Sequence, residues 1–229
     1  MIDLVLLHGA IGSAEQTKIL QEIPQNKFRL HHIELSGHGK KSSVDVNFSM
    51  DAFVDEVEKY FNDNKLTDVN FFGYSMGGYV GLLHAVKYSG RIARLMTLGT
   101  KFYWTPEVAA KEVSMLDSEK IKEKVPAFAA QLEAQHGANW SDVLRRTTAL
   151  MKNLGENNPI DALDLGAVKI PVKLLLAQYD HMVTPKETLE IYKRLNNVGF
   201  QRLANSKHPL EQVDIDALGE EIIQWFAYQ

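Results

Sequence analysis

The fold is decided by the segment Val69-Asn-Phe-Phe-Gly-Tyr-Ser75-Met-Gly-Gly-Tyr-Val-Gly-Leu-Leu-His-Ala85, an apolar strand pattern that passes through a Gly-x-Ser-x-Gly turn into a helix pattern. A serine at the tip of so sharp a turn has strained backbone, which requires that the residues two before and two after it lack side chains. Gly73 and Gly77 meet this requirement. The turn would therefore expose the Ser75 hydroxyl at the carboxyl edge of the strands, where open α/β sheets bind ligands.

The rest of the chain alternates apolar strand patterns with amphipathic helix patterns. Besides the strand that begins at Val69, strands are predicted at residues 2–7, 28–35, 91–98, 170–177 and 200–204. Helices are predicted at about residues 13–23, 50–62, 185–195 and 213–226, in addition to the helix after Ser75. This alternation predicts an α/β fold with a mostly parallel, doubly wound sheet of about six strands.

A different pattern occupies residues 102–166, where no strand is indicated. Helices are predicted to begin at Thr105-Pro106, to run from 118 to 136 with an interruption at Pro126, and to run from 141 to 154. Such a helical block between two core strands is too long to be a loop. We therefore expect a core formed by residues 1–101 and 167–229, with residues 102–166 inserted into it.

The composition excludes several classes of function. Hydrophobic residues make up 45% and charged residues 24% of the 229 residues, and no apolar run approaches the roughly 18 residues that span a bilayer. A formal net charge of −4 gives no basic surface for nucleic acid or for an anionic membrane. The absence of cysteine excludes disulfides, thiolate metal sites and a cysteine nucleophile. No signal-peptide pattern follows Met1, so we expect a cytoplasmic protein, either a monomer or a homodimer.

The strand, turn and helix around Ser75 resemble the nucleophile elbow of the α/β-hydrolase superfamily. The resemblance extends from residue 2 to residue 226. It implies a sheet that lacks the first two strands of larger family members, and a helical cap, residues 102–166, above the active site. Side chains of this cap would line a substrate pocket, although each could equally serve in packing between helices. The candidates are Phe102, Trp104, Met115, Phe128, Trp140 and Met151.

A serine hydroxyl is a weak nucleophile unless an imidazole removes its proton and a carboxylate orients that imidazole. The family supplies the three groups in the order serine, acid, histidine. Ser75, Asp180 and His208 occur in this order, and the last two each follow a predicted strand. His136 and His181 are the alternatives to His208 as the base.

The resemblance also implies an oxyanion hole formed by the backbone N–H groups of Ala10, which follows the His8-Gly9 pair, and of Met76. His38, in the turn Gly-His-Gly after the second strand, is assigned to the architecture. No metal-ligand spacing, dinucleotide fingerprint or phosphate loop is present, so no cofactor or metal is expected.

Together these features predict a serine hydrolase that cleaves a carboxylic ester or thioester of a small, mostly apolar substrate through an acyl-enzyme on Ser75. The same triad also serves carbon–carbon bond hydrolases and a lyase of menaquinone synthesis, so these remain alternatives. A receptor that binds a ligand without turnover on the same scaffold is an alternative of another class.

Overall fold

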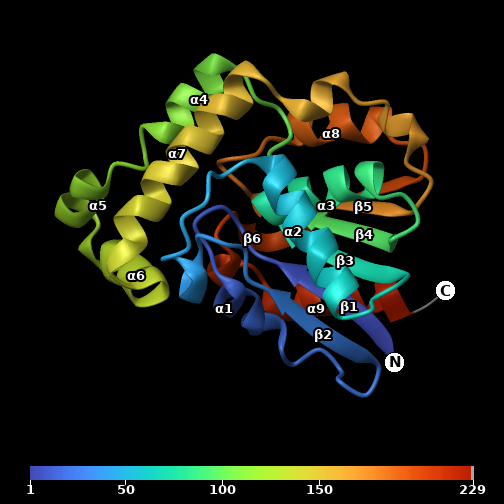
Figure 1. Cartoon of the computed structure of the whole chain (residues 1–229). Coiled ribbons are helices and arrows are strands. Elements are labelled where there is room, and N and C mark those ends of the chain that lie inside the picture. The colour runs from blue at the N-terminus through green and yellow to red at the C-terminus, as the bar shows by residue number, and fades with distance from the viewer. Residues whose placement is uncertain (228–229) are drawn as a thin grey trace.

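The computed structural model describes residues 1–227, which form a parallel sheet with helices on both faces (Figure 1). The strands are β1 (Ile2–Leu7), β2 (Phe28–Ile33), β3 (Val69–Tyr74), β4 (Ile92–Leu98), β5 (Val172–Tyr179) and β6 (Val198–Lys207). Their order in the sheet is β2-β1-β3-β4-β5-β6, and every neighbouring pair is parallel. The predicted α/β class and the six strands are confirmed.

The helices follow the predicted pattern with one exception. They are α1 (Ala14–Thr17), α2 (Met50–Asp63), α3 (Met76–Lys87), α4 (Pro106–Val113), α5 (Ser118–Lys124), α6 (Pro126–His136), α7 (Trp140–Glu156), α8 (Pro185–Arg194) and α9 (Ile215–Ala227). The predicted break at Pro126 separates α5 from α6.

The exception is the helix predicted at residues 13–23, which has only the four α-helical residues of α1 followed by a 3-10 turn, Lys18–Leu20. The buried residues of this stretch are Ser13, Thr17, Leu20 and Ile23. The last three recur every third residue, which is the repeat of a 3-10 helix.

The final strand, β6, is longer than the predicted 200–204 at both ends. It lies at the edge of the sheet and pairs only with β5, and most of its side chains are exposed or half-buried. An edge strand of this kind lacks the continuous apolar run by which buried parallel strands are recognised.

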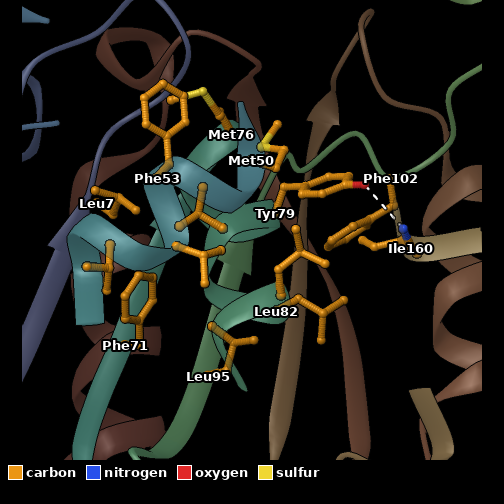
Figure 2. Close-up of a cluster of buried hydrophobic side chains, with 14 of the residues drawn as sticks. Leu7, Met50, Phe53, Phe71, Met76, Tyr79, Leu82, Leu95, Phe102 and Ile160 are labelled. Atoms are coloured by element: carbon orange, nitrogen blue, oxygen red, sulfur yellow. Dashed lines mark hydrogen bonds between the residues drawn. The ribbon is translucent and has the colours of Figure 1, made fainter. Parts of the chain in front are cut away.

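Strand residues alternate between two apolar layers because successive side chains in a strand point to opposite faces. In β1, Val5 and Leu7 join the layer beneath α2, α3 and α8, whereas Leu4 and Leu6 join the layer beneath α1 and α9. Figure 1 shows α2 and α3 on the viewer's side of the sheet and α9 behind it. Figure 2 shows part of the first layer, where Phe53 of α2 and Leu82 of α3 lie among side chains of the strands.

The turn between β3 and α3 has the strained geometry that the sequence predicts. Ser75 has φ 51° and ψ −115°, a region that residues with a side chain rarely adopt. A Cβ atom on Gly73 would lie 2.4 Å from the carbonyl carbon of Gly77, and one on Gly77 would lie 2.4 Å from the carbonyl oxygen of Leu7. Backbone therefore occupies the space that side chains would need, and α3 starts directly against β1.

Residues 102–166, which we call the inserted segment, connect β4 to β5 and carry α4, α5, α6 and α7. Figure 1 shows these four helices together at the left of the molecule. Their small apolar cluster, formed by Ile121, Ala129, Leu132, Trp140 and Leu144, has Ile11 of the core packed against it. The inserted segment thus has an apolar cluster of its own, while other side chains of the segment, such as Ala109, Val143 and Leu154, belong to the main core layer.

Candidate active site

Asp180 and His208, which follow β5 and β6, are joined by a hydrogen bond of 2.8 Å from Nδ1 of the histidine to Oδ2 of the aspartate. The aspartate side chain is 1% exposed, and its Oδ1 accepts the N–H groups of Met182 and Val183, both at 2.8 Å. Asp180 therefore faces donors on both oxygens. Because Nδ1 of His208 is the donor in this pair, Nε2 of the neutral ring is free to accept a proton.

His208 is also held from the other side by Tyr74, the last residue of β3. The Tyr74 hydroxyl donates to the His208 carbonyl oxygen at 2.9 Å, and the two ring centroids are 5.7 Å apart. Burial raises the pKa of Tyr74 above its ordinary value, so its hydroxyl keeps its proton as a donor. The alternatives to His208 lie elsewhere, because His181 is exposed and His136 is buried against the loop that follows β1.

Ser75 lies between two cavities, and His208 lines both of them. The inner cavity has a volume of about 40 Å³ and apolar walls that include Met50, Tyr79 and Leu150. The outer cavity has a volume of about 360 Å³. Its walls combine apolar residues, such as Leu116, Phe128 and Met151, with Gln16, Gln131, Gln135 and Gln212. A molecule that reaches Ser75 would thus meet mostly apolar walls in both cavities, with glutamines only in the outer one.

Three of the six predicted pocket residues line these cavities. Trp104 lines the inner cavity, Phe128 lines the outer cavity and Met151 lines both.

The other three predicted pocket residues lie outside both cavities. Phe102 is buried in the core against Tyr79, with ring centroids 5.9 Å apart (Figure 2). Trp140 belongs to the apolar cluster of the inserted segment. Met115 is 53% exposed, and its neighbour Leu116 lines the outer cavity instead.

Ala10 and Met76 both line the inner cavity beside Ser75. Among residues 1–227, no protein acceptor receives the backbone N–H of either residue. Two N–H groups without protein acceptors beside a serine could bind a negatively charged oxygen.

Three buried histidines, His8, His38 and His136, surround the loop that carries Ala10. Burial lowers the pKa of His8 to about 4 and that of His38 to about 3, and it also lowers the pKa of His136. All three rings are therefore neutral near pH 7.

Lys101 is a charged residue of the inner cavity that the sequence reasoning missed. Its Nζ lies 3.2 Å from Glu187 Oε1 and 3.5 Å from Glu112 Oε1, and its side chain is 10% exposed. Its position in the sequence could have indicated it, because Lys101 closely follows the end of β4 and therefore lies at the same sheet edge as Ser75. The two carboxylates carry more charge than the one ammonium group, so Lys101 gives the cavity no net positive field.

Within residues 1–227, no group of three or more His, Asp or Glu side chains is placed to hold a metal ion. In the same range, no helix has both the length and the apolar character needed to cross a membrane.

The fold and this site define a class of α/β protein in which a strained serine and a hydrogen-bonded histidine–aspartate pair come together at one sheet edge. Residues 4–137 match the family model described as the alpha/beta hydrolase fold. The chain therefore belongs to the α/β-hydrolase family.

Two curated relatives align with less than half of the chain. The chain is 30% identical over 105 residues to pimeloyl-[acyl-carrier protein] methyl ester esterase of Photorhabdus laumondii. This alignment covers 46% of the chain and 38% of the relative. Over 99 residues the chain is 31% identical to a putative 2-succinyl-6-hydroxy-2,4-cyclohexadiene-1-carboxylate synthase of Bacillus subtilis, covering 42% of this chain and 36% of the relative. In each case the chain spans less than two fifths of the relative's length.

The similarity in structure covers the whole fold. A thermophilic esterase from Thermogutta terrifontis superposes with a TM-score of 0.78 at 21% identity, over 99% of this chain and 90% of the esterase. At this identity the similarity shows the fold alone.

Proposed function

We propose that the protein is a serine hydrolase that cleaves an ester or thioester of a small, mostly apolar acyl group, with Ser75, His208 and Asp180 as its catalytic triad. The observation that carries the proposal is that the strained Ser75 and His208, which is hydrogen-bonded to the buried Asp180, line the same two cavities. The esterase relative and the family membership support the same reaction class.

In the acylation step, Nε2 of His208 takes the proton of the Ser75 hydroxyl while Oγ attacks the ester carbonyl carbon. The carbonyl oxygen becomes negatively charged, and the N–H groups of Ala10 and Met76 stabilise it. The imidazolium that forms is stabilised by Asp180 through the 2.8 Å hydrogen bond. It then donates its proton to the departing alcohol or thiol, which leaves an acyl group on Ser75.

In the deacylation step, neutral His208 removes a proton from a water molecule that attacks the acyl carbon. The same two N–H groups stabilise the second negatively charged oxygen. Collapse of this intermediate breaks the bond to Ser75, which recovers its proton from His208, and the carboxylic acid is released.

The two cavities suggest how the substrate lies. The inner cavity of about 40 Å³ holds more than the 10–15 Å³ that one water needs, and much less than the roughly 150 Å³ cavity that binds benzene. We therefore assign it to an acyl group of about two to four carbons. The outer cavity of about 360 Å³, which glutamines line together with apolar residues, is assigned to a larger leaving group. In this arrangement the inserted segment acts as a cap, because it supplies Trp104 and Leu150 to one cavity and Phe128 and Gln131 to the other.

The test is steady-state hydrolysis of p-nitrophenyl esters of graded acyl length by the wild-type protein and by Ser75→Ala. We expect many turnovers per protein molecule, the highest kcat/KM for short acyl groups, and a fall in kcat of about 10⁴-fold or more in the variant. A single equivalent of product would instead indicate a receptor on a hydrolase scaffold. Equal activity of Ser75→Ala would remove Ser75 from the mechanism.

The similarity to a putative 2-succinyl-6-hydroxy-2,4-cyclohexadiene-1-carboxylate synthase supports a second candidate, in which this protein is a lyase whose triad acts without an acyl-enzyme. Rapid-quench mass spectrometry distinguishes the two, because an esterase gains the mass of the acyl group on Ser75 during turnover. A lyase gains no such mass.

A further inference from the structure

The loop that follows β1 is held by three buried histidines from three separate parts of the chain. His8 Nδ1 lies 2.8 Å from the Gly9 carbonyl oxygen. His38 Nε2 lies 2.7 Å from the carbonyl oxygen of Ala10, and His136 Nε2 lies 3.0 Å from that of Ile11. Three successive carbonyl groups therefore each face one imidazole ring.

The partners of the second ring nitrogens determine where two of the protons lie. Leu35 donates its N–H to His8 Nε2 at 3.3 Å, and Gly39 donates its N–H to His136 Nδ1 at 2.8 Å. A nitrogen that accepts a hydrogen bond carries no proton, so in both neutral rings the proton lies on the nitrogen that faces the loop. In His38 the contact with the Ala10 oxygen, at 2.7 Å, is shorter than the 3.3 Å contact of Nδ1 with the Ser36 oxygen, which assigns the proton to Nε2.

The geometry of the peptide bond links these contacts to the proposed oxyanion hole. The carbonyl group of Gly9 and the N–H of Ala10 belong to one planar trans peptide, in which they point in opposite directions. Holding the Gly9 oxygen against His8 therefore fixes the direction of the Ala10 N–H. The next peptide is held in the same way, because the Ala10 oxygen also accepts the Thr147 hydroxyl of α7 at 3.3 Å.

We propose that His8, His38 and His136 are positioning residues that hold three successive peptides of this loop and so orient the Ala10 N–H toward the reacting oxygen, and that His136 makes this orientation depend on α6 of the inserted segment. The inference rests on the proposed function, because it assigns supporting residues to the proposed oxyanion hole.

His136 is the link to the inserted segment, since it is the last residue of α6. Its carbonyl oxygen accepts the Ser42 hydroxyl at 2.7 Å, so the end of this helix is bound both to the loop after β1 and to the segment after β2. The same helix supplies Gln131 and Gln135 to the outer cavity. A leaving group that displaces α6 would therefore also change the hydrogen bond to the Ile11 oxygen.

The test compares His136→Leu, which removes the ring N–H donor, with His136→Gln, whose side-chain amide can donate from a position close to that of Nε2. His84→Leu is the matched control, because His84 is also buried but bonds Glu58 of α2 at 3.0 Å. For each protein, kcat and KM are measured with a short-chain ester. Hydrogen–deuterium exchange is measured for the amide of residue 12. The Gly12 N–H reports on the loop because it donates to the Gly9 oxygen at 3.1 Å.

We expect His136→Leu to lower kcat by about tenfold to a hundredfold with KM changed less than about twofold, since an oxyanion donor acts mainly in the transition state. Exchange at residue 12 should accelerate in the same variant. His136→Gln should recover most of the kcat and most of the protection from exchange. His84→Leu should leave kcat and the exchange rate close to those of the wild type.

Unchanged kcat and unchanged exchange in His136→Leu would overturn the proposal. Equal losses in His136→Leu and His136→Gln would also overturn it, because the hydrogen bond would then not be the cause. If the wild-type protein shows no turnover that depends on Ser75, the proposed function fails. The exchange measurement then decides alone whether His136 holds the loop.

Discussion

The sheet core and the inserted segment contribute to the same two cavities by different means. The core contributes Ser75, whose φ of 51° is fixed by a turn in which backbone atoms leave no room for a Cβ on Gly73 or Gly77. The inserted segment contributes side chains, Trp104 from the loop before α4 and Phe128 and Leu150 from helices. The backbone geometry of the core cannot change without loss of the fold. A side chain of the inserted segment, in contrast, can be substituted while the fold is kept. We infer that the core determines the reaction and the inserted segment determines the substrate.

The largest effect is expected from Gly77→Ala in the core. Its Cβ would lie 2.4 Å from the carbonyl oxygen of Leu7, and neither backbone can move without separating α3 from β1. We expect a loss of several kcal/mol in the free energy of unfolding, or no folded protein. The control is Gly219→Ala in α9, where no atom lies within 4 Å and the change should stabilise the helix by about 0.5–1 kcal/mol. Equal urea midpoints for the two variants would contradict this account of the turn.

The second effect concerns the reaction, which the comparison assigns to the core. His208→Ala should lower kcat by about 10⁴-fold or more while the melting temperature stays close to that of the wild type, because the other triad members cannot act without a base. His181→Ala is the control, since this histidine is exposed. Steady-state kinetics with one short ester checks both variants. A kcat within tenfold of the wild type in His208→Ala would mean that another group is the base.

The third effect lies at the boundary of the two regions, where His8 and His38 are buried. Their pKa values in the folded protein, about 4 and about 3, lie below the value of 6.5 for an ordinary histidine, so the unfolded chain binds more protons between these limits. The contribution of the two neutral rings to the free energy of unfolding is therefore fully present above about pH 6.5, and it falls as the pH decreases toward 4. The expected loss for His8 is about 3 kcal/mol.

Urea midpoints measured from pH 7.5 to pH 4.5 check this prediction. His38→Gln, which keeps a donor but does not titrate, should reduce the slope of stability against pH. A constant urea midpoint between pH 6.5 and pH 5 would contradict the burial of these rings in their neutral form.

The smallest effect is expected from Leu150→Ala in the inserted segment, which enlarges the inner cavity. Each additional buried CH₂ group is worth about 0.8 kcal/mol, so kcat/KM for an acyl group one carbon longer should rise by about fourfold relative to the wild type. Gln131→Ala, which changes only the outer cavity, should leave the acyl-length profile unchanged. The two profiles are measured with the same series of esters. If both variants shift the profile equally, the assignment of the acyl group to the inner cavity is wrong.

The difference between the two regions also explains how much could be predicted from the sequence. The strands and the turn at Ser75 depend on local patterns, and the predicted fold is confirmed. Ser75 is indicated by its Gly-x-Ser-x-Gly turn. Asp180 and His208 are indicated because each follows a strand, and the structure brings these two residues into hydrogen-bond contact.

Pocket lining could not be predicted in the same way, because adjacent positions of the inserted segment can face different directions. Met115 is exposed while Leu116 lines the outer cavity, and Phe102 lies in the core while Trp104 lines the inner cavity. The contact of His136 with the Ile11 carbonyl joins residues 125 positions apart and leaves no local pattern. Such residues can be identified only when the packing of the inserted segment on the core is known.

The central claim, that Ser75 is the nucleophile, is tested most directly by labelling with a fluorophosphonate and locating the modified residue by peptide mass spectrometry. The account predicts one label per protein molecule, located on Ser75, and at least a thousandfold slower labelling in His208→Ala because the base would be lost. A label on another serine, or an equal labelling rate without His208, would contradict the claim.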